Sequence, residues 1–265
     1  MVSEFELIPP TASRPIHTLQ LDLLPERSGS AATNMATDFL LLKHYPQPDH
    51  ARFRAYSWQR PAYTFGYSQK IAFVRDHLPA GFDGELCRRP TGGGIVDHRV
   101  DWTYAIVIPR GADLYDERAV ESYRVIHQAI TEALLHVGVD AQLKTVCEPP
   151  ATEDAAAGKN CRPTAPGVCF QRAERFDVVH SRTGAKLAGA AQKRAKHGLL
   201  FQGSLARAAI EIDGAIDWDA FTDSFTTGLG AALQAEPTPS PWPDIDEVID
   251  DLADQYSTTE WIEYR

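Results

Sequence analysis

The chain has 265 residues, 43% of them hydrophobic and 23% charged, a composition typical of a globular protein with a substantial core. Its net charge of −10 argues against a general nucleic-acid binder, which needs a basic face. No apolar run approaches the roughly 20 residues of a membrane-spanning helix. The N-terminus, MVSEFELIPPTASRP, lacks the features of a secretory signal, so we expect a cytoplasmic protein.

Cysteine usage bears on metal binding and on nucleophilic chemistry. The four cysteines are Cys87, Cys147, Cys161 and Cys169, and no two of them form a C-x-x-C pair. Structural zinc sites usually contain such close pairs, so we expect no metal. In a reducing compartment all four are thiols, and the question is whether one of them is reactive.

The first half of the chain contains predicted strands and two predicted helices. The strands are 17–24, 52–58, 61–67 and 101–109, the last apolar enough to be buried on both faces. Residues 28–45 and 119–139 have apolar side chains at helical spacing. Ser30 or Thr33 suits the N-cap of the first helix, and Gly138 suits the end of the second.

The second half begins with a long connection. Residues 146–168 are small, Pro-rich and aperiodic, which predicts a long surface loop. The predicted strands that follow are 175–181, 185–194, 198–205 and 208–213, and the predicted helices are 217–225 and 243–256. Because hairpin-length links dominate, we expect one α/β domain over residues 1–265 with a mostly antiparallel sheet. Residues 1–15 are expected to be loosely held.

Three adjacent glycines, Gly92, Gly93 and Gly94, follow Arg88 and Arg89 between two strand-like runs. One interpretation is a flexible bend, since glycine in strands often marks a bulge. The other is close approach of the backbone to an extended ligand, with an arginine offering charge to an anionic group. The loop is neither a Walker A motif nor a dinucleotide fingerprint.

Cys169 and Lys186 are a possible reactive pair. Cys169 lies where the long loop enters a strand, and Lys186 follows seventeen residues later. If the next two strands form a hairpin, the two side chains can come close, and an ammonium lowers a thiol pKa from about 8.5 toward neutrality. The alternatives are a small buried cysteine and a solvated lysine, and the spacing leaves them open.

Four stretches together resemble the lipoate–biotin protein ligase superfamily, whose members attach lipoate, octanoate or biotin to a carrier lysine. They are NMATDFLL (34–41), PAYTFGYSQ (61–69), RRPTGGGIVDH (88–98) and GAKLAGAAQKR with GLLFQGSL (184–205). The resemblance spans roughly residues 30–213. It implies the fold of the biotin/lipoate protein ligase catalytic domain, with a mixed, mostly antiparallel sheet flanked by helices.

Within this superfamily, VCFQRAERFDVV resembles the LipM-type octanoyltransferases rather than the ligases, which typically have an Arg-Asn-Asp signature there. The resemblance implies that Cys169 is the acyl-accepting nucleophile and Lys186 its partner. It implies octanoyl-acyl carrier protein as donor and, as acceptor, a lipoyl carrier such as glycine-cleavage H protein or a dehydrogenase E2 lipoyl domain. Because thioester exchange is near neutral and amide formation is downhill, we expect no ATP or other cofactor. Lys186 and backbone N–H groups around Gly189 or Cys169 are candidate oxyanion stabilisers.

The resemblance places the acyl chain along the glycine loop, in a narrow apolar slot. The candidate substrate-binding residues are Arg89, Thr91, Gly92, Gly93, Gly94, Ile95, Val96, His98, Gly189, Gln192 and Ser204, with the aromatic strand 63–67 as a further wall. His98 and the departing thiolate are both candidates for deprotonating the acceptor lysine.

Two departures from the family pattern leave other functions open. Gly189-Ala190-Ala191 replaces Gly-Ser-Ala, and Gln202-Gly203-Ser204 replaces His-Gly-Ser. One alternative is an ATP-dependent lipoate ligase in which Lys186 and the Arg88/Arg89 region hold an adenylate phosphate. The other is a non-catalytic binder of acylated or lipoylated carriers. Residues 178–210 contain six Lys or Arg and no acidic residue, and form either a solvated edge or a landing site for acidic carriers.

Overall fold

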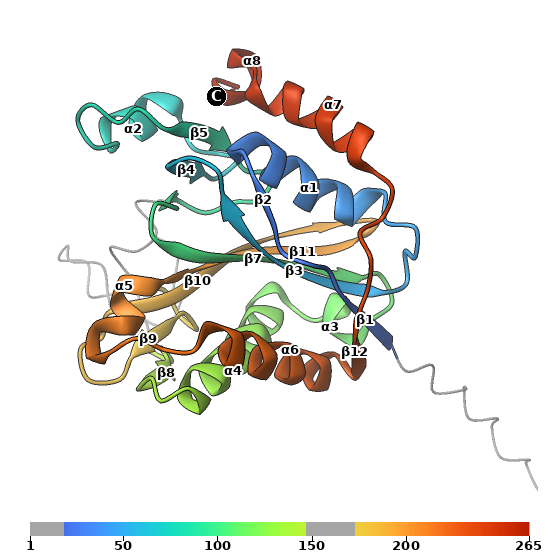
Figure 1. The fold of residues 1–265 in the computed structure, drawn as a ribbon, viewed down its shortest axis with the longest axis vertical. Helices are drawn as coiled ribbons and strands as arrows, with labels where there is room; N and C mark the ends of the chain where they lie inside the picture. The colour runs from blue at the N-terminus through green and yellow to red at the C-terminus, as the bar shows by residue number, and fades with distance from the viewer. Residues whose placement is uncertain (1–18, 147–172, 265) are drawn as a thin grey trace, which may run out of the picture.

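The main sheet of the protein has nine strands, with helices on both of its faces (Figure 1). A computed structural model describes residues 19–146 and 173–264. The strand order is β12-β1-β3-β7-β11-β10-β9-β8, with β2 paired to β3. The bounds are β1 Leu19–Leu23, β2 Arg27–Gly29, β3 Ala51–Trp58, β7 Asp101–Pro109, β8 Ala141–Leu143, β9 Val178–His180, β10 Lys186–Ala195, β11 Gly198–Ala206 and β12 Ala235–Pro239.

Strand β7 is buried on both faces because helices cover both sides of the sheet. On one side Ile106 and Ile108 pack in a core with α4 (Ala119–His136) and α6 (Trp218–Leu233). On the other side Val107 packs in a core with α1 (Ala31–Lys43) and α7 (Asp246–Ser257). The alternation of one strand between two cores explains its continuous apolar sequence. The remaining short helices are α2 Ile71–Asp76, α3 Asp113–Asp116, α5 Arg207–Ile210 and α8 Thr259–Ile262.

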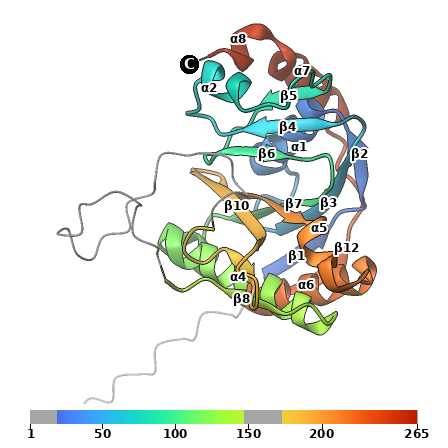
Figure 2. The same ribbon diagram turned by 90° about the vertical axis from the view of Figure 1, so that its left-hand side faces the viewer.

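A small second sheet lies above the main one (Figure 2). It consists of β5 (Glu85–Arg88), β4 (Ala62–Phe65) and β6 (Ile95–Asp97), with β4 central. The three glycines lie in the connection from β5 to β6. The small sheet therefore holds the glycine loop over the β10–β11 hairpin, where a Cβ on Gly93 would lie 3.5 Å from Ala191 Cβ.

Most predicted elements are confirmed, and the helix ends follow the predicted signals. Ser30 is the N-cap of α1, and its side chain accepts a hydrogen bond from the Thr33 N–H at 3.1 Å. Gly138 follows the end of α4 with φ of +85°, a conformation that favours glycine. None of the helices that the structure describes is long and apolar enough to cross a membrane.

One predicted strand was wrong, and the strands β2, β8 and β12 were not predicted. The stretch 208–213 is not a strand but α5 followed by a 3-10 turn, Glu211–Asp213. The apolar–polar alternation of the sequence Ile210-Glu211-Ile212-Asp213 imitates a strand. In the structure Ile210 is buried and Ile212 is 60% exposed, so the two isoleucines do not share one face as they would in a strand, and no neighbouring strand pairs with this stretch. Conversely, β12 was not predicted, because its sequence AEPTP is rich in proline. It pairs with β1 at the edge of the sheet, where proline is tolerated.

Arg88 joins the small sheet to the C-terminal helix α8. Its guanidinium is fully buried and donates to the carbonyl oxygens of Tyr67 and Gln69 at 2.7 and 2.8 Å. It also donates to the carbonyls of Trp261 and Ile262 at 3.0 and 2.7 Å. The Arg88 side chain thus donates hydrogen bonds to backbone carbonyls of two segments that are far apart in the sequence.

Replacing Arg88 by Met should therefore release α8 and lower the free energy of unfolding by at least about 3 kcal/mol, because unpaired carbonyls cost about 1–3 kcal/mol each. Urea unfolding and limited proteolysis at the C-terminus measure this. The matched control is Arg75→Met, which removes the exposed Arg75–Glu263 ion pair to the same segment and should cost under about 1 kcal/mol. Equal losses in the two variants would contradict the role given to Arg88.

Candidate active site

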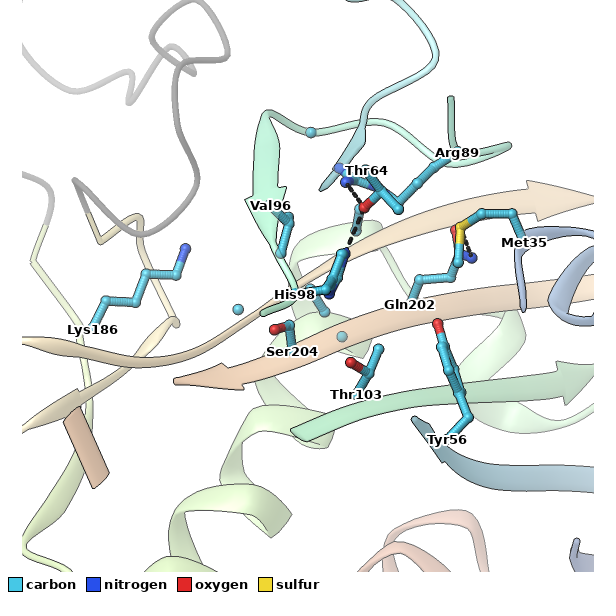
Figure 3. Close-up of a pocket in the computed structure, with 15 residues that line it drawn as sticks. Met35, Tyr56, Thr64, Arg89, Val96, His98, Thr103, Lys186, Gln202 and Ser204 are labelled. Atoms are coloured by element: carbon cyan, nitrogen blue, oxygen red, sulfur yellow. Dashed lines mark hydrogen bonds between the residues drawn. The ribbon is translucent and has the colours of Figure 1, made fainter. Parts of the chain in front are cut away.

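A narrow pocket of about 50 Å³ lies between the glycine loop and the β10–β11 hairpin. Figure 3 shows Lys186 at one end, Met35, Tyr56 and Gln202 at the other, and His98 between them. The lining residues come from both sheets and from α1. They are Met35, Tyr56, Thr64, Arg89, Gly93, Val96, His98, Thr103, Lys186, Gly189, Ala190, Ala191, Gln202, Gly203 and Ser204.

Lys186 is held by a buried carboxylate. Its ammonium lies 2.7 Å from Asp177 Oδ2, and the two side chains are only 8% and 1% exposed. Asp177 also accepts from the Tyr123 hydroxyl at 2.5 Å and from the Glu174 N–H at 2.7 Å. Burial is the main cause that raises the pKa of Tyr123 well above its usual value, so its hydroxyl stays a donor. The pair is desolvated and well supplied with hydrogen bonds, as a stable buried ion pair must be.

Local backbone features give Lys186 its position. The register between β9 and β10 shifts between Lys186 and Ala188, and such a bulge re-aims side chains. The lysine side chain then passes over Gly189, where an added Cβ would lie 2.5 Å from Lys186 Cε and 2.6 Å from Nζ. Gly189 is therefore needed for the space that it leaves.

The glycine loop is shaped mainly by Gly93. It has φ of +91°, a conformation that L side chains rarely adopt, and it lines the pocket. Close packing also requires Gly66 of the preceding turn, where a Cβ would lie 2.1 Å from the Gly93 carbonyl oxygen. A Cβ on Gly92, in contrast, would meet no atom within 4 Å. The geometry of this region therefore requires glycine at positions 66 and 93 but not at position 92.

A chain of hydrogen bonds crosses the pocket through His98. Arg89 Nη1 donates to Thr64 Oγ1 at 2.8 Å, and that oxygen lies 2.7 Å from His98 Nε2. His98 Nδ1 lies 2.7 Å from Asp101 Oδ2, which also accepts from Ser204. Since a carboxylate only accepts, Nδ1 carries a proton and donates a hydrogen bond to Asp101. The His98 ring also stacks on the Trp58 ring, with 4.0 Å between the two ring centres.

A second network closes the far end of the pocket around Gln202. Its amide oxygen accepts from Thr91 Oγ1 at 2.7 Å, and its nitrogen donates to Asp38 Oδ2 at 2.7 Å. Asp38 is fully buried and paired with Arg54 at 2.7 Å. Burial raises the pKa of Asp38, although Arg54 and the hydrogen bond from Gln202 oppose this effect. Glutamine fits here because it donates and accepts at once.

The structure brings together only part of the predicted substrate-binding set. The predicted residues that line the pocket are Arg89, Gly93, Val96, His98, Gly189 and Ser204. Thr91, Gly92, Gly94, Ile95 and Gln192 do not line it. Arg88, offered as a second cation for the ligand, is engaged by backbone carbonyls outside it.

The corrections have clear physical causes. Ile95 points into a separate core with Tyr63 and Phe65, because neighbouring strand residues face opposite sides, so those aromatic rings are not pocket walls. Gln192 donates to the Ala119 carbonyl at 2.6 Å. Thr91 reaches the pocket only through Gln202. The lining residues to which the sequence analysis gave no role of their own include Met35, Tyr56 and Thr64. Met35 and Thr64 lie in stretches that the resemblance matched, whereas Tyr56 lies in the predicted strand 52–58, outside those stretches.

The predicted nucleophile Cys169 lies outside the described residues, as do Cys147, Cys161 and most of the long loop predicted over 146–168. Among the residues that the structure describes, Cys87 is the only cysteine. It is buried, and burial raises the pKa of its thiol to about 12. Cys87 therefore serves packing and is a poor nucleophile.

The basic residues of 178–210 do not form one compact patch. Arg182 pairs with Asp140 and Asp213, and Arg194 donates to the Glu117 carbonyl at 2.7 Å. Lys186 and Lys196 lie at opposite ends of the β10–β11 hairpin. The positive charge is therefore distributed along the length of the sheet.

A further buried group fixes the backbone next to Asp177. Phe176 has φ of +68°, uncommon for a residue other than glycine, and its carbonyl lies 2.7 Å from His127 Nδ1. His127 Nε2 is buried without a hydrogen-bond partner among the described residues. Burial lowers the pKa of His127 from 6.5 to about 4. A neutral His127 thus donates to the strained segment that presents Asp177.

Comparisons with known proteins match the part of the chain that contains the pocket residues. The family described as Lipoyl protein ligase A/B catalytic domain matches residues 30–211. An octanoyltransferase LipM of Geobacillus kaustophilus is 34% identical over 178 residues, 66% of this chain and 60% of that protein. An octanoyltransferase LipM of Kyrpidia tusciae is 31% identical over 185 residues, 69% of this chain and 64% of that protein.

Two solved structures share the fold. The bipartite lipoate protein ligase of Thermoplasma acidophilum has a TM-score of 0.68 at 18% identity, covering 93% of this chain and 98% of that one. A lipoate-protein ligase A bound with ATP has a TM-score of 0.67 at 19% identity, covering 92% and 98%. At these identities the likeness concerns the fold alone, and it confirms the predicted fold class.

The chain thus has the fold of the lipoate protein ligases. It belongs to the lipoyl protein ligase A/B catalytic domain family. The matched part of the chain spans about 60% of the length of the Geobacillus relative.

Replacing Gly189 by Ala should displace the Lys186 side chain from Asp177, because the new methyl group would overlap Cε and Nζ. We expect acetylation of Lys186 by an amine-reactive reagent, followed by peptide mass spectrometry, to become at least tenfold faster. Gly228→Ala is the control, since a Cβ there makes only ordinary contact with Ala129 at 3.5 Å. An unchanged rate for Gly189→Ala would show that the lysine does not depend on this space.

Replacing His127 by Asn should make the free energy of unfolding depend less on pH between pH 6.5 and 4. Between pH 6.5 and 4 the unfolded chain binds a proton at His127 that the native chain excludes, so stability falls as pH falls, by up to about 3 kcal/mol. Asparagine keeps a donor for Phe176 and does not titrate. Urea unfolding from pH 4 to 7.5 measures the slope, and the exposed His136→Asn on the same helix is the control. A slope unaltered by His127→Asn would refute this assignment.

Proposed function

We propose that this chain is a protein octanoyltransferase that acts in the cytoplasm. An octanoyl group passes from acyl carrier protein to Cys169 and then to a lysine of a lipoyl-carrier domain, of the glycine-cleavage H protein or dehydrogenase E2 type. The observation that carries the proposal is the ammonium of Lys186, held by Asp177 at one end of the pocket. The 34% identity to an octanoyltransferase LipM supports it.

The chemistry consists of two acyl transfers. In the first, the Cys169 thiolate adds to the thioester carbon of the donor, and the carrier thiolate leaves and takes up a proton. In the second, the acceptor amine adds to the new thioester, Cys169 leaves as thiolate, and the amine loses a proton. The first step is near neutral and the second is downhill, so the reaction needs no ATP.

The described residues have fitting roles in these steps. The Lys186 ammonium can stabilise the oxyanion of each tetrahedral intermediate, and its bond to Asp177 fixes it before the reaction begins. His98 is oriented by Asp101 and can receive the proton of the acceptor amine. Thr64 lies at the ring nitrogen that would take this proton.

The acyl chain requires the pocket to widen. Its volume of about 50 Å³ is well below the ~150 Å³ of a cavity that holds benzene. Met35 at the far end is unbranched and adaptable, and it accepts a hydrogen bond from Gln202 at 3.2 Å. Movement of Met35 would lengthen the slot, and each buried methylene contributes roughly 0.8 kcal/mol to chain-length preference.

Intact mass spectrometry tests the proposal. Mixing the protein with octanoyl-acyl carrier protein should add one octanoyl group, and Cys169→Ser should abolish this adduct. Cys87→Ser is the matched control, because the Cys87 thiol is buried with a pKa of about 12, and it should leave the adduct in place.

The same assay, extended with a lipoyl domain, separates the alternatives. Transfer that requires ATP and survives Cys169→Ala would identify a lipoate ligase acting through an acyl-adenylate. Neither adduct nor transfer would leave a non-catalytic binder of acylated carriers. Either result would refute the octanoyltransferase assignment.

A further inference from the structure

A second cavity, of about 310 Å³, lies beside the turn between β10 and β11, at the opposite end of β10 from Lys186. Ten strand residues at about 3.3 Å each place it roughly 30 Å from that lysine. Segments far apart in the sequence meet here, at the ends of α1 and β7 and the start of β3 (Figure 1). The cavity is therefore separate from the candidate active site.

The lining of this cavity is strongly basic although the chain carries a net charge of −10. Its basic residues come from α1, β3, the end of β7 and the β10–β11 turn. They are Lys43, Arg52, Arg110, Lys196 and His197. Asp49 is the single acidic residue among the described residues that line it. Four permanent positive charges thus face one negative charge.

Arg52 is the informative member of this group because it is only 2% exposed. Its Nε donates to the Leu41 carbonyl at 2.9 Å and its Nη1 to the His50 carbonyl at 2.5 Å. Among the described residues, its Nη2 has no acceptor and its guanidinium has no carboxylate within 4.0 Å. Burial lowers the pKa of Arg52 to about 10.

The Asp22 carboxylate, whose charge acts on Arg52, is already engaged by other groups. Asp22 accepts from the Tyr45 hydroxyl at 2.6 Å, from Ser240 at 2.9 Å, and lies 3.0 Å from His50 Nδ1. Tyr45 in turn packs against the Arg52 guanidinium, 4.7 Å from its ring centre. A buried cation without a bonded anion is costly, and an anion in the cavity would remove that cost.

We propose that this cavity binds a phosphate group, either as the free ion or as the phosphate of a small ester. Guanidinium and ammonium groups are suited to phosphate oxygens, and the cavity gathers both kinds. A small ligand fits better than an acidic protein surface, because the decisive guanidinium is buried inside the cavity. This inference does not depend on the proposed acyl transfer.

Isothermal titration calorimetry of the full chain with inorganic phosphate, at constant ionic strength, tests the proposal. We expect saturable binding at one site, weakened at least tenfold in Arg110→Ser/Lys196→Ser. Both residues are exposed, so the double variant should fold. The control is Lys70→Ser/Arg118→Ser, which removes two exposed cations elsewhere and should bind phosphate as the parent protein does.

A parallel titration with adenosine monophosphate distinguishes the two sources. Binding at least tenfold tighter than that of phosphate would identify an ester as the ligand, and equal or weaker binding would identify the free ion. Unsaturable phosphate heats, or equal affinities in the two double variants, would overturn the proposal. So would binding of polyglutamate, sensitive to Arg110→Ser/Lys196→Ser, in the absence of phosphate binding, because that result identifies a surface for acidic polypeptides.

Discussion

The buried ion pair between Lys186 and Asp177 is the constraint around which the candidate active site is arranged. Removing two charges from water is expensive, and their attraction compensates only when further hydrogen bonds complete the pair. Tyr123 from α4 and the Glu174 N–H supply those bonds. The bulge at the start of β10 and the missing side chain at Gly189 follow from the same requirement. A helix, a loop end and a strand are thereby tied to one ammonium group.

The pocket lies between the two sheets, and two networks of polar side chains connect the sheets across it. One runs from Arg89 through His98 to Asp101, and the other connects Thr91 through Gln202 to the buried Asp38. Because buried polar groups cost free energy when unpaired, such networks fix the side chains that belong to them. Met35 and Val96 supply apolar surface between the networks. The result is a narrow slot with a charged end at Lys186.

The two ends of the β10–β11 hairpin present opposite electrostatic situations. At one end the cation is matched by a buried carboxylate, and at the other Arg52 is buried with no carboxylate within 4.0 Å among the residues that the structure describes. The first arrangement is complete in the protein itself, as expected for a group that must be positioned before a reaction. In the second, an anion bound in the cavity would supply the missing negative charge. One element thus connects the candidate active site to the second, basic cavity.

The sequence by itself determined the family and the main strands and helices, and it singled out Lys186, His98 and Gly93, which the structure places around one pocket. Those features depend on local periodicity, helix caps and sequence motifs, which can be recognised without knowing which distant residues meet. It did not determine that Asp177 pairs with Lys186, that Gln202 bonds to Asp38, or that Ile95 faces away from the pocket. Nor did it identify β12, whose prolines contradict strand propensity until an edge partner is present. These facts belong to tertiary structure, because pairing register and burial decide which distant side chains meet.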